Sequence, residues 1–491
     1  MVAEEVESIA KRRGFFWPAA EIYKPIAGFW NWGPLGTRLK SNFLAEWRKA
    51  FVKGENAYEI ETTDILPEIV WQASGHSEGF NDKQTMCKKC KSRFRADHLI
   101  EEFTKTKEKL EGKSCEDLTK IIEKEKLRCE KCKGSLSEVF VFNLMFSVGV
   151  GPTGEQKAYL KPETTQSSVL DFPNVYRTMR GKLPLKIAQV GRSFRNEISP
   201  RNIMLRMREF DMAELQVFFN SEEKEFAGFE NIRKENIRIL PAELRKGKEG
   251  KEVEVSIEEA LKKGWVPNEL TAYYLAKVFR FYLSLGFERK NLRFKELLPE
   301  ERAHYAKVHW DFEVYTEDFG WVECVNNAWR TDYDLSRHQQ FSKQKLTVFE
   351  DNKHVLPNIY EPSFGINRTL FLLLVSAYRK DEKRAWFSLP PALAPYSAAV
   401  FPLVKKDGVD KKAQEVFNML SKDGFEVFYD ESDSIGRRYA RVDEIGIPFA
   451  VTVDYQTLED KAVTVRFRDS TKQERVAIAD LGKFIKSAAK L

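Results

Sequence analysis

The sequence predicts an α+β protein: a large antiparallel-sheet domain with helices, followed by a smaller C-terminal α/β domain. Three observations carry this prediction. Residues 185–219 alternate like a β-hairpin, and residues 308–328 contain two more strand-like runs that follow one another directly. After a proline cluster at 390–395, strand-like and helix-like segments alternate over about a hundred residues, which is typical of a compact α/β domain.

Hydrophobic periodicity justifies the other elements in chain order. Leu39, Phe43, Leu44, Trp47 and Phe51 share one helical face and predict a helix over 39–52. Further strands are predicted near 138–144, 157–161, 398–404, 425–429 and 449–454, and further helices at 272–287, 369–378, 410–422 and 434–444. These patterns predict a large domain over 1–390, with a cysteine-bearing insertion at 82–140 and a Lys/Glu-rich insertion at 220–300 that has its own small core. A second domain is expected over 391–491.

Composition narrows the class of protein. The 491 residues are 42% hydrophobic and 31% charged, as in an ordinary soluble globular protein. The net charge of +6 is compatible with a nucleic-acid partner without demonstrating one. The N-terminus lacks the apolar stretch of a secretory signal, and the most apolar run, TLFLLLVSAY, is too short to span a bilayer. We therefore expect a cytosolic protein with no membrane partner.

Four of the six cysteines form two C-x-x-C knuckles, CKKC and CEKC, separated by 38 residues. Paired knuckles place four thiolates for a tetrahedral Zn²⁺ ion. Disulfides are the alternative, but a cytosolic chain of this size disfavours them. The predicted ligands of a structural zinc are Cys87, Cys90, Cys129 and Cys132.

A charged hairpin, residues 191–214, places arginines, an aromatic ring and an acid in one alternating row. Side chains two apart share a strand face, so Arg206, Phe210 and Glu214 are expected to point the same way. Such a row suits a triphosphate, a flat base and an amine. The alternative is a solvated hairpin with cross-strand ion pairs.

Several stretches then resemble a known family. FRNEISPRNIMLRMREFDMAE (194–214) is similar to motif 2 of the class II aminoacyl-tRNA synthetases, and EPSFGINRTLFLLL (361–374) to their motif 3. YLKPETTQS, LPEIVWQASGH and GFWNWGPLGTRLK narrow the resemblance to glycyl-tRNA synthetases of the homodimeric, archaeal and eukaryotic-like type. The likeness covers about residue 10 to about residue 485. It implies ATP-dependent attachment of glycine to tRNA(Gly) through glycyl-adenylate, by an antiparallel-sheet catalytic domain and an anticodon-binding α/β domain.

The resemblance also implies which residues bind ATP. Arg195 and Arg368 are expected to be catalytic, with Arg195 on the α-phosphate and Arg368 over the adenine that stacks on Phe210. Glu323 is expected to hold the Mg²⁺ that accompanies ATP. The full expected ATP site is Arg195, Asn196, Glu197, Arg206, Met207, Phe210, Glu323, Cys324 and Arg368.

For glycine, the resemblance implies a pocket of carboxylates that accepts an ammonium group and leaves no room for a side chain. The expected residues are Glu163, Glu214, Glu361, Ser363 and Arg95. Two residues depart from the family pattern: Asn326 and Trp329 stand where the family usually has glycine and aspartate. The amino-acid site is therefore expected to differ locally from the family.

The C-terminal domain offers Arg437, Arg441, Asp443 and Asp454 for reading anticodon bases. Alternatively, these charges face solvent. The segment around 28–52 is similar to motif 1, which implies a homodimer. Three rival functions remain open: a synthetase for another amino acid, a synthetase-like protein without catalysis, and a zinc-ribbon RNA-binding scaffold.

Overall fold

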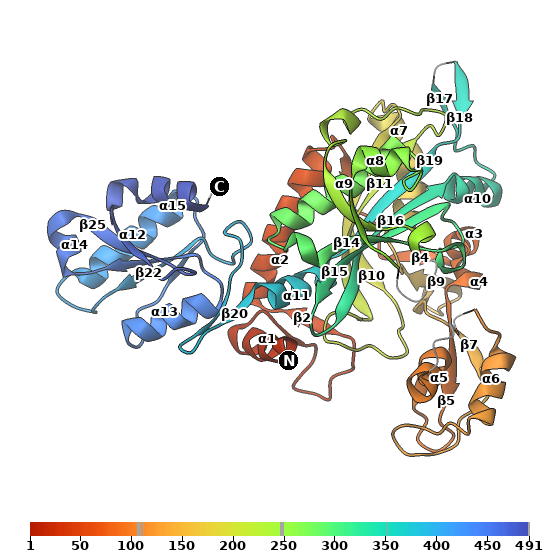
Figure 1. Ribbon diagram of the computed structural model, residues 1–491, viewed down its shortest axis with the longest axis horizontal. Helices are drawn as coiled ribbons and strands as arrows, with labels where there is room; N and C mark the ends of the chain where they lie inside the picture. The colour runs from red at the N-terminus through yellow and green to blue at the C-terminus, as the bar shows by residue number, and fades with distance from the viewer. Residues whose placement is uncertain (106–109, 111, 246–249, 351, 490–491) are drawn as a thin grey trace.

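A nine-stranded sheet forms the centre of the large domain in the computed structural model, which describes residues 1–491 except 106–109, 111, 246–249, 351 and 490–491 (Figure 1). Its strand order is β13-β12-β14-β15-β16-β19-β11-β10-β3. Neighbouring strands are antiparallel except β12 with β14 and β10 with β3. The strands are β3 Tyr58–Ile60, β10 Leu185–Phe194, β11 Glu209–Phe219, β12 Asn236–Leu240, β13 Val253–Ser256, β14 Leu292–Glu296, β15 Val308–Thr316, β16 Gly320–Thr331 and β19 Asn358–Gly365.

Helices cover both faces of this sheet. Ala213, Leu215 and Val217 of β11 point into the main hydrophobic core, which they share with residues of α2, α9 and α11. Phe218, on the other face of β11, packs with Phe172 of α7 in a second cluster. The helices of the large domain are α1 Val2–Arg13, α2 Pro34–Trp47, α3 Glu68–Ala73, α4 His76–Gly79, α7 Thr165–Thr178, α8 Ile257–Lys262, α9 Glu269–Ser284, α10 Tyr333–Ser342 and α11 Ile366–Ala377. Because strand side chains alternate, Glu214 shares the α7 face with Phe218.

Segment 220–300 differs from its prediction. Its strands β12, β13 and β14 extend the central sheet instead of forming a separate unit. Ile237, Ile239 and Phe294 belong to the main core, together with the buried residues of α9. The prediction that this segment has a small core of its own is therefore wrong. Its strands pair with strands far away in the sequence, and this pairing merges the segment with the rest of the domain.

Residues 81–143 form a small module at the lower right of Figure 1. A three-stranded sheet, β6-β5-β7, carries two helices and a hydrophobic cluster of its own. The elements are β5 Asn81–Met86, β6 Arg93–Arg95, α5 Ala96–Thr104, α6 Cys115–Lys124 and β7 Phe140–Asn143. Immediately after β7, the Leu144 carbonyl accepts a bond from the Asn196 backbone N–H at 2.7 Å, which ties the base of the module to the charged hairpin.

Four smaller sheets accompany the central sheet of the large domain. They are β1 Phe16–Pro18 with β2 Trp30–Trp32, β4 Ile65–Pro67 with β9 Gln156–Leu160 and β8 Ser147–Val150, β17 Val348–Glu350 with β18 Lys353–Val355, and β20 Tyr378–Lys380 with β21 Ala385–Phe387. None of the described helices has the length and apolarity needed to cross a membrane.

The C-terminal domain is a five-stranded sheet of order β23-β22-β24-β25-β26 with helices and its own core, at the left of Figure 1. Its elements are β22 Ala398–Pro402, α12 Val409–Lys422, β23 Val427–Tyr429, α13 Ile435–Glu444, β24 Phe449–Val453, α14 Tyr455–Asp460, β25 Ala462–Phe467, β26 Gln473–Ala477 and α15 Leu481–Ala489. Helix α13 contacts the large domain: Glu444 pairs with Arg13 at 2.6 Å, and Asp443 pairs with Arg384 at 2.6 Å.

Candidate active site

A cavity of about 900 Å³ opens on the α7 face of the central sheet. Strands β11, β16 and β19 and the segment after β10 contribute most of its polar lining. At one end lie the carboxylates Glu163, Glu214 and Glu361, and at the other the arginines Arg206 and Arg368. The two ends therefore differ in charge, as a site for an amine and a polyphosphate requires.

Strand geometry brings the acidic end together. Ser363 of β19 lies opposite Glu214 of β11 in the strand register, and its hydroxyl donates to Glu214 Oε1 at 2.8 Å. Glu361 lies two residues before Ser363 and therefore on the same face. Glu163 comes from the turn before α7. The three glutamates are 8%, 1% and 4% exposed for residues 163, 214 and 361, so they form one buried carboxylate cluster.

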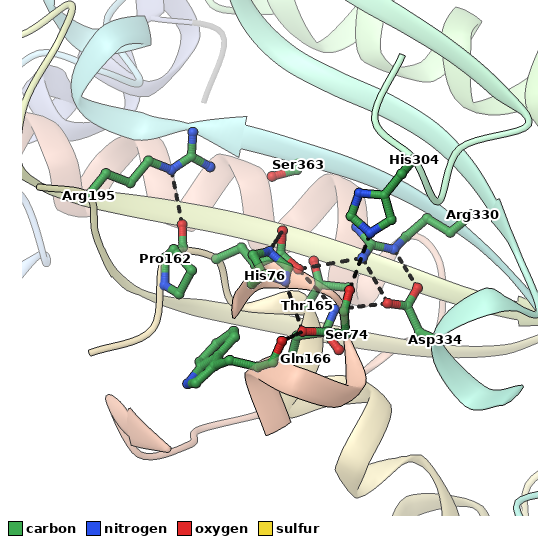
Figure 2. A network of polar contacts seen from close by, with 12 residues as sticks. Ser74, His76, Pro162, Thr165, Gln166, Arg195, His304, Arg330, Asp334 and Ser363 are labelled. Carbon is green, nitrogen blue, oxygen red and sulfur yellow. Dashed lines mark hydrogen bonds and ion pairs between the residues drawn. The ribbon is translucent and has the colours of Figure 1, made fainter. Parts of the chain in front are cut away.

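Arg330 neutralises part of this buried charge. Its side chain is fully buried on β16, with Nε 2.7 Å from Asp334 Oδ2 and Nη1 3.3 Å from Glu361 Oε2 (Figure 2). A third contact joins Nη2 to Glu163 Oε1 at 3.5 Å, and the guanidinium lies 3.6 Å from the centre of the Tyr305 ring. One guanidinium thus faces several carboxylates, and such a group is stable only when nearly every oxygen has a partner.

His76 supports Glu163 from the other side. His76 Nε2 lies 3.4 Å from Glu163 Oε2, and its Nδ1 shares a hydrogen bond with the Ser74 hydroxyl at 2.8 Å. Gly75 has a φ of +84°, and a Cβ there would meet His304 Nε2 at 3.0 Å. Only glycine accommodates this turn comfortably, and the turn places His76 at the cavity wall.

The three glutamates have different pKa values. Burial would raise the pKa of Glu163, but the neighbouring His76 and Arg330 outweigh burial and hold it well below its ordinary value. Burial raises the pKa of Glu361 to about 8, and the charges of Glu214 and Glu163 add to this rise against Arg330. Burial and the charge of Glu163 also raise the pKa of Glu214. The cluster therefore contains one firmly ionised carboxylate and two that hold a proton more readily.

The arginine end is built around Arg195 and Phe210. Arg195 follows β10, its Nε donates to the Pro162 carbonyl at 3.1 Å, and its guanidinium lies 5.4 Å from the ring centres of both Phe80 and Phe210. Figure 2 shows the Arg195–Pro162 bond at the side of the site where Ser363 also lies.

Arg206 differs from its predicted place on a strand. Strand β11 begins at Glu209, and Asn202 and Ile203 have left-handed φ angles of 56° and 58°, which end the hairpin pairing early. Arg206 therefore lies in the loop, where its Nε pairs with Glu197 Oε2 at 2.8 Å. Both side chains still line the cavity, as does Met207.

Arg368 and Glu323 close this end. Arg368, in the first turn of α11, donates through Nε to the Leu205 carbonyl at 3.2 Å and lies 3.6 Å from Glu323 Oε2. Cys324 is 2% exposed, and burial raises the pKa of its thiol to about 12, so the thiol is neutral. Glu323 is exposed within the cavity, next to the nearly buried Asp311, whose pKa is raised by burial and by the Glu323 charge.

Two expected site residues do not line the cavity. Asn196 lies beside it and is held through its backbone N–H. Arg95 lies in the small module, where it pairs with Asp97 at 2.5 Å and with Asp82 at 3.3 Å. Its side chain is therefore engaged away from the carboxylate cluster.

The two departures from the family pattern lie on opposite faces of β16. Asn326 lines the cavity, and its Nδ2 lies 2.6 Å from His309 Nε2. Trp329 points into the main core, where it packs on Phe219 and donates to Asn358 Oδ1 at 2.9 Å. Only Asn326 therefore changes the surface of the cavity.

The four knuckle cysteines converge in the small module. Their Sγ atoms all lie within 4.8 Å of one another, with Cys87–Cys132 and Cys90–Cys129 both at 3.5 Å. These separations suit a tetrahedron with metal–sulfur bonds of about 2.3 Å. The donor set therefore fits Zn²⁺.

In the C-terminal domain, the four predicted anticodon residues have unequal surroundings. Arg437 is exposed and 3.4 Å from Asp433, while Arg441 pairs with Asp430 and Asp433. Asp443 is 1% exposed and bound by Arg466 and Arg384, so its carboxylate is occupied within the protein. Asp454 caps α14 through the Thr457 N–H at 2.9 Å and pairs with Arg475.

Comparison with known proteins places the chain in a family. The sequence model described as "tRNA synthetase class II core domain (G, H, P, S and T)" matches residues 149–377, and the one described as "Anticodon binding domain" matches residues 397–488. A glycine–tRNA ligase of Pyrococcus horikoshii is 41% identical, with 98% of each chain covered. This chain belongs to the glycine–tRNA ligase family.

A second member of the glycine–tRNA ligase family is similar to this chain over its whole length. The glycine–tRNA ligase of Methanocaldococcus jannaschii is 38% identical, with 100% of this chain and 99% of that protein covered. The Pyrococcus alignment spans 561 positions against 491 residues here, so that ligase has stretches without a counterpart in this chain. A prolyl-tRNA synthetase structure from Cryptosporidium parvum, complexed with L-proline and AMP, superimposes with a TM-score of 0.62 at 13% identity, over 99% of this chain and 75% of that one. The class II fold is thereby confirmed.

The site contains polar residues that sequence reasoning missed. Arg330, Thr165, His76 and Asp334 all contact the carboxylate cluster directly or through one partner. Three of them could have been found from the resemblance to the family. Thr165 and His76 lie in the family-like stretches YLKPETTQS and LPEIVWQASGH, and Arg330 is the family arginine that follows Trp329. No local periodicity marks them, because all four lie at the ends of elements: Thr165, His76 and Asp334 in the first turns of helices, and Arg330 at the end of β16.

Proposed function

We propose that this chain is an ATP-dependent ligase that attaches glycine to its tRNA through a glycyl-adenylate. The observation that carries the proposal is the buried carboxylate cluster beside Ser363, facing an arginine–phenylalanine platform across one cavity. The cluster suits an ammonium without a side chain, and the platform suits ATP.

The first step is attack of the glycine carboxylate on the α-phosphorus of ATP. A carboxylate–phosphorus bond forms, the α–β phosphate bridge breaks, and pyrophosphate leaves with the electron pair. Two anions must approach, so the step needs fixed positive charge more than a general base. Arg195 would hold the α-phosphate and the glycine carboxylate together, and Arg206 the outer phosphates.

Adenine would stack between Phe210 and Arg368. Mg²⁺ carried with ATP would be held by Glu323, a hard oxygen donor beside the phosphates, where it would offset phosphate charge. Glu163, Glu214 and Glu361 would surround the glycine ammonium.

In the second step, a hydroxyl of the terminal tRNA adenosine attacks the glycyl carbonyl. The ester forms and AMP leaves as the acyl–phosphate bond breaks. Arg437 is the best placed of the four proposed anticodon contacts, because its side chain is 77% exposed, while Asp443 is buried and Arg441 and Asp454 are only partly exposed and ion-paired. A cytosolic location remains the prediction of the sequence.

Amino-acid-dependent ATP–pyrophosphate exchange tests the proposal. Glycine should support exchange, while alanine, serine, proline and threonine should not. Exchange with another amino acid instead of glycine would favour a different synthetase. No exchange with any amino acid would favour a non-catalytic relative.

We predict one structural Zn²⁺ per chain at the cysteine cluster. Metal analysis of protein purified without chelator should find zinc near equimolar with protein, and Cys90→Ser with Cys132→Ser should remove it. The variant should also lose thermal stability in the 81–143 module, because metal binding and folding are coupled. Disulfide-linked knuckles or absent zinc would contradict the assignment.

We also propose that the chain is a homodimer, since motif 1 resembles the interface segment of its class. Sedimentation at micromolar concentration should give twice the mass of the 57.1 kDa chain. A stable monomer would rule the dimer out.

A further inference from the structure

One hydroxyl lies between two of the three glutamates. Thr165 Oγ1 is 2.6 Å from Glu361 Oε2 and 3.1 Å from Glu214 Oε2, and Thr165 is fully buried at the start of α7. A hydroxyl has a single proton to donate. It can donate to one carboxylate oxygen only, and the other short contact needs a proton on the second carboxyl, which donates back to Thr165.

The charges around the pair favour that extra proton. Glu163, Glu214, Glu361 and Asp334 are all buried, and the Arg330 guanidinium contacts three of them, Glu163, Glu361 and Asp334. Full ionisation would leave several buried negative charges opposite one guanidinium, which is unfavourable without another cation. Several groups face the pair. They are Glu163 from the turn before α7, His76 from the start of α4, Asp334 from α10, Arg330 from β16, Tyr305 from the loop before β15, and Ser363 and Gln216 from the sheet.

We propose that Thr165 is a positioning residue that links Glu214 and Glu361 around one shared proton, and that the ammonium of glycine displaces this proton when it binds. The inference rests on the proposed function, in which glycine binds beside Ser363. The ammonium restores the charge that the departing proton carried, so the cluster has the same net charge before and after binding. Burial and like charges already raise the pKa of Glu361 to about 8, which places the exchange near neutral pH.

Glycine binding and loss of the shared proton are linked, so the affinity for glycine should depend on pH. Glycine binds the form of the pair that has lost the proton, so its affinity is lowest where the empty pair is protonated. Below a pKa of about 8, the KM for glycine should fall about tenfold for each unit rise in pH, and above it should level off. The KM for ATP should not follow this profile, because the arginine end contains none of these groups.

Calorimetry of the full-length protein counts the proton directly. Glycine and a non-hydrolysable glycyl-adenylate analogue are titrated at pH 7 in phosphate, HEPES and Tris buffers, whose ionisation enthalpies differ. The dependence of the observed enthalpy on the buffer should show release of about 0.5 to 1 proton per site. The matched analogue without the amino group should release none, and Glu361→Gln should abolish release by the amine-bearing ligand. Zero release by wild-type protein would overturn the inference.

Thr165 is tested with a matched pair of variants. Thr165→Val keeps the shape and removes the hydroxyl, so the protonated pair loses two hydrogen bonds and the ionised pair loses one. The midpoint of the glycine pH profile should therefore fall by up to about one unit. Thr165→Ser keeps the hydroxyl and should retain the wild-type midpoint. A Thr165→Val variant that loses activity without moving the midpoint would show that Thr165 only supports the fold. Glycine-dependent exchange by the same wild-type preparation separates the two proposals: exchange without proton release refutes the linkage alone, and absent exchange refutes the function.

Discussion

Replacing Arg195 by glutamine should reduce kcat for glycine-dependent ATP–pyrophosphate exchange about 10²- to 10³-fold, the usual effect of removing one preorganised charge from a transition state. The guanidinium lies 5.4 Å from the centre of the Phe210 ring, in the cavity that also contains the carboxylate cluster, and the proposed function has it hold the glycine carboxylate and the α-phosphate together. Its protein contacts are one bond to a carbonyl and two aromatic neighbours, so the melting temperature should change little. Exchange kinetics and thermal unfolding measure both effects.

Arg192 provides the matched control. It lies on β10, three residues before Arg195, is exposed, and pairs with Glu209 at 2.8 Å outside the cavity. Arg192→Gln should leave exchange within about twofold of wild type, as expected for a surface ion pair. If both variants lose activity equally, the effect belongs to the stability of β10 and not to the chemistry of Arg195.

Replacing Glu214 by glutamine should lower kcat/KM for glycine about 10- to 150-fold. The change keeps the shape of the side chain but removes a charge-assisted hydrogen bond to the ammonium, worth roughly 1.5–3 kcal/mol. The KM for ATP should stay nearly constant, because Phe210 and the arginines are untouched. Steady-state exchange kinetics with each substrate varied in turn give both constants.

Glu209 on the same strand is the control for this variant. It is half-buried, outside the cavity lining, and paired with Arg192, so Glu209→Gln should preserve glycine kinetics. A parallel rise in the KM for ATP in Glu214→Gln, or no loss with glycine, would identify Glu214 as only a structural partner of Ser363, Gln216 and Thr165.

Strand alternation correctly predicted that two of the candidate side chains share a face. Phe210 and Glu214 share a face of β11, as period two requires, and both line the cavity. The same reasoning placed Arg206 on the strand, where the structure has a loop with left-handed turns at Asn202 and Ile203. The alternation of residue types continues through this loop, but the extended backbone does not. A pattern of side-chain types does not show which residues have a left-handed φ.

Long-range pairing explains the other differences. The Lys/Glu-rich composition of 220–300 reflects the exposed surfaces of this segment. It did not predict that Ile239 and Phe294 lie on paired strands that belong to the central sheet and the main core. Likewise, Arg330 meets Glu163 and Glu361 from separate segments of the sequence. Local periodicity reports which face of an element is apolar and not which distant element covers it.

Helix α13 has different neighbours along its length. Arg437 and Arg441 lie beside the Asp430–Asp433 turn, and Asp443 and Glu444, at the C-terminal end of the helix, contact the large domain. A rotation of α13 in response to a molecule at Arg437 and Arg441 must therefore either break the Arg13–Glu444 and Arg384–Asp443 pairs or move α1 and β21 with it. Helix α13 therefore connects the two domains. While these ion pairs hold, a displacement of the C-terminal domain also displaces α1, the N-terminal helix that packs beside α11.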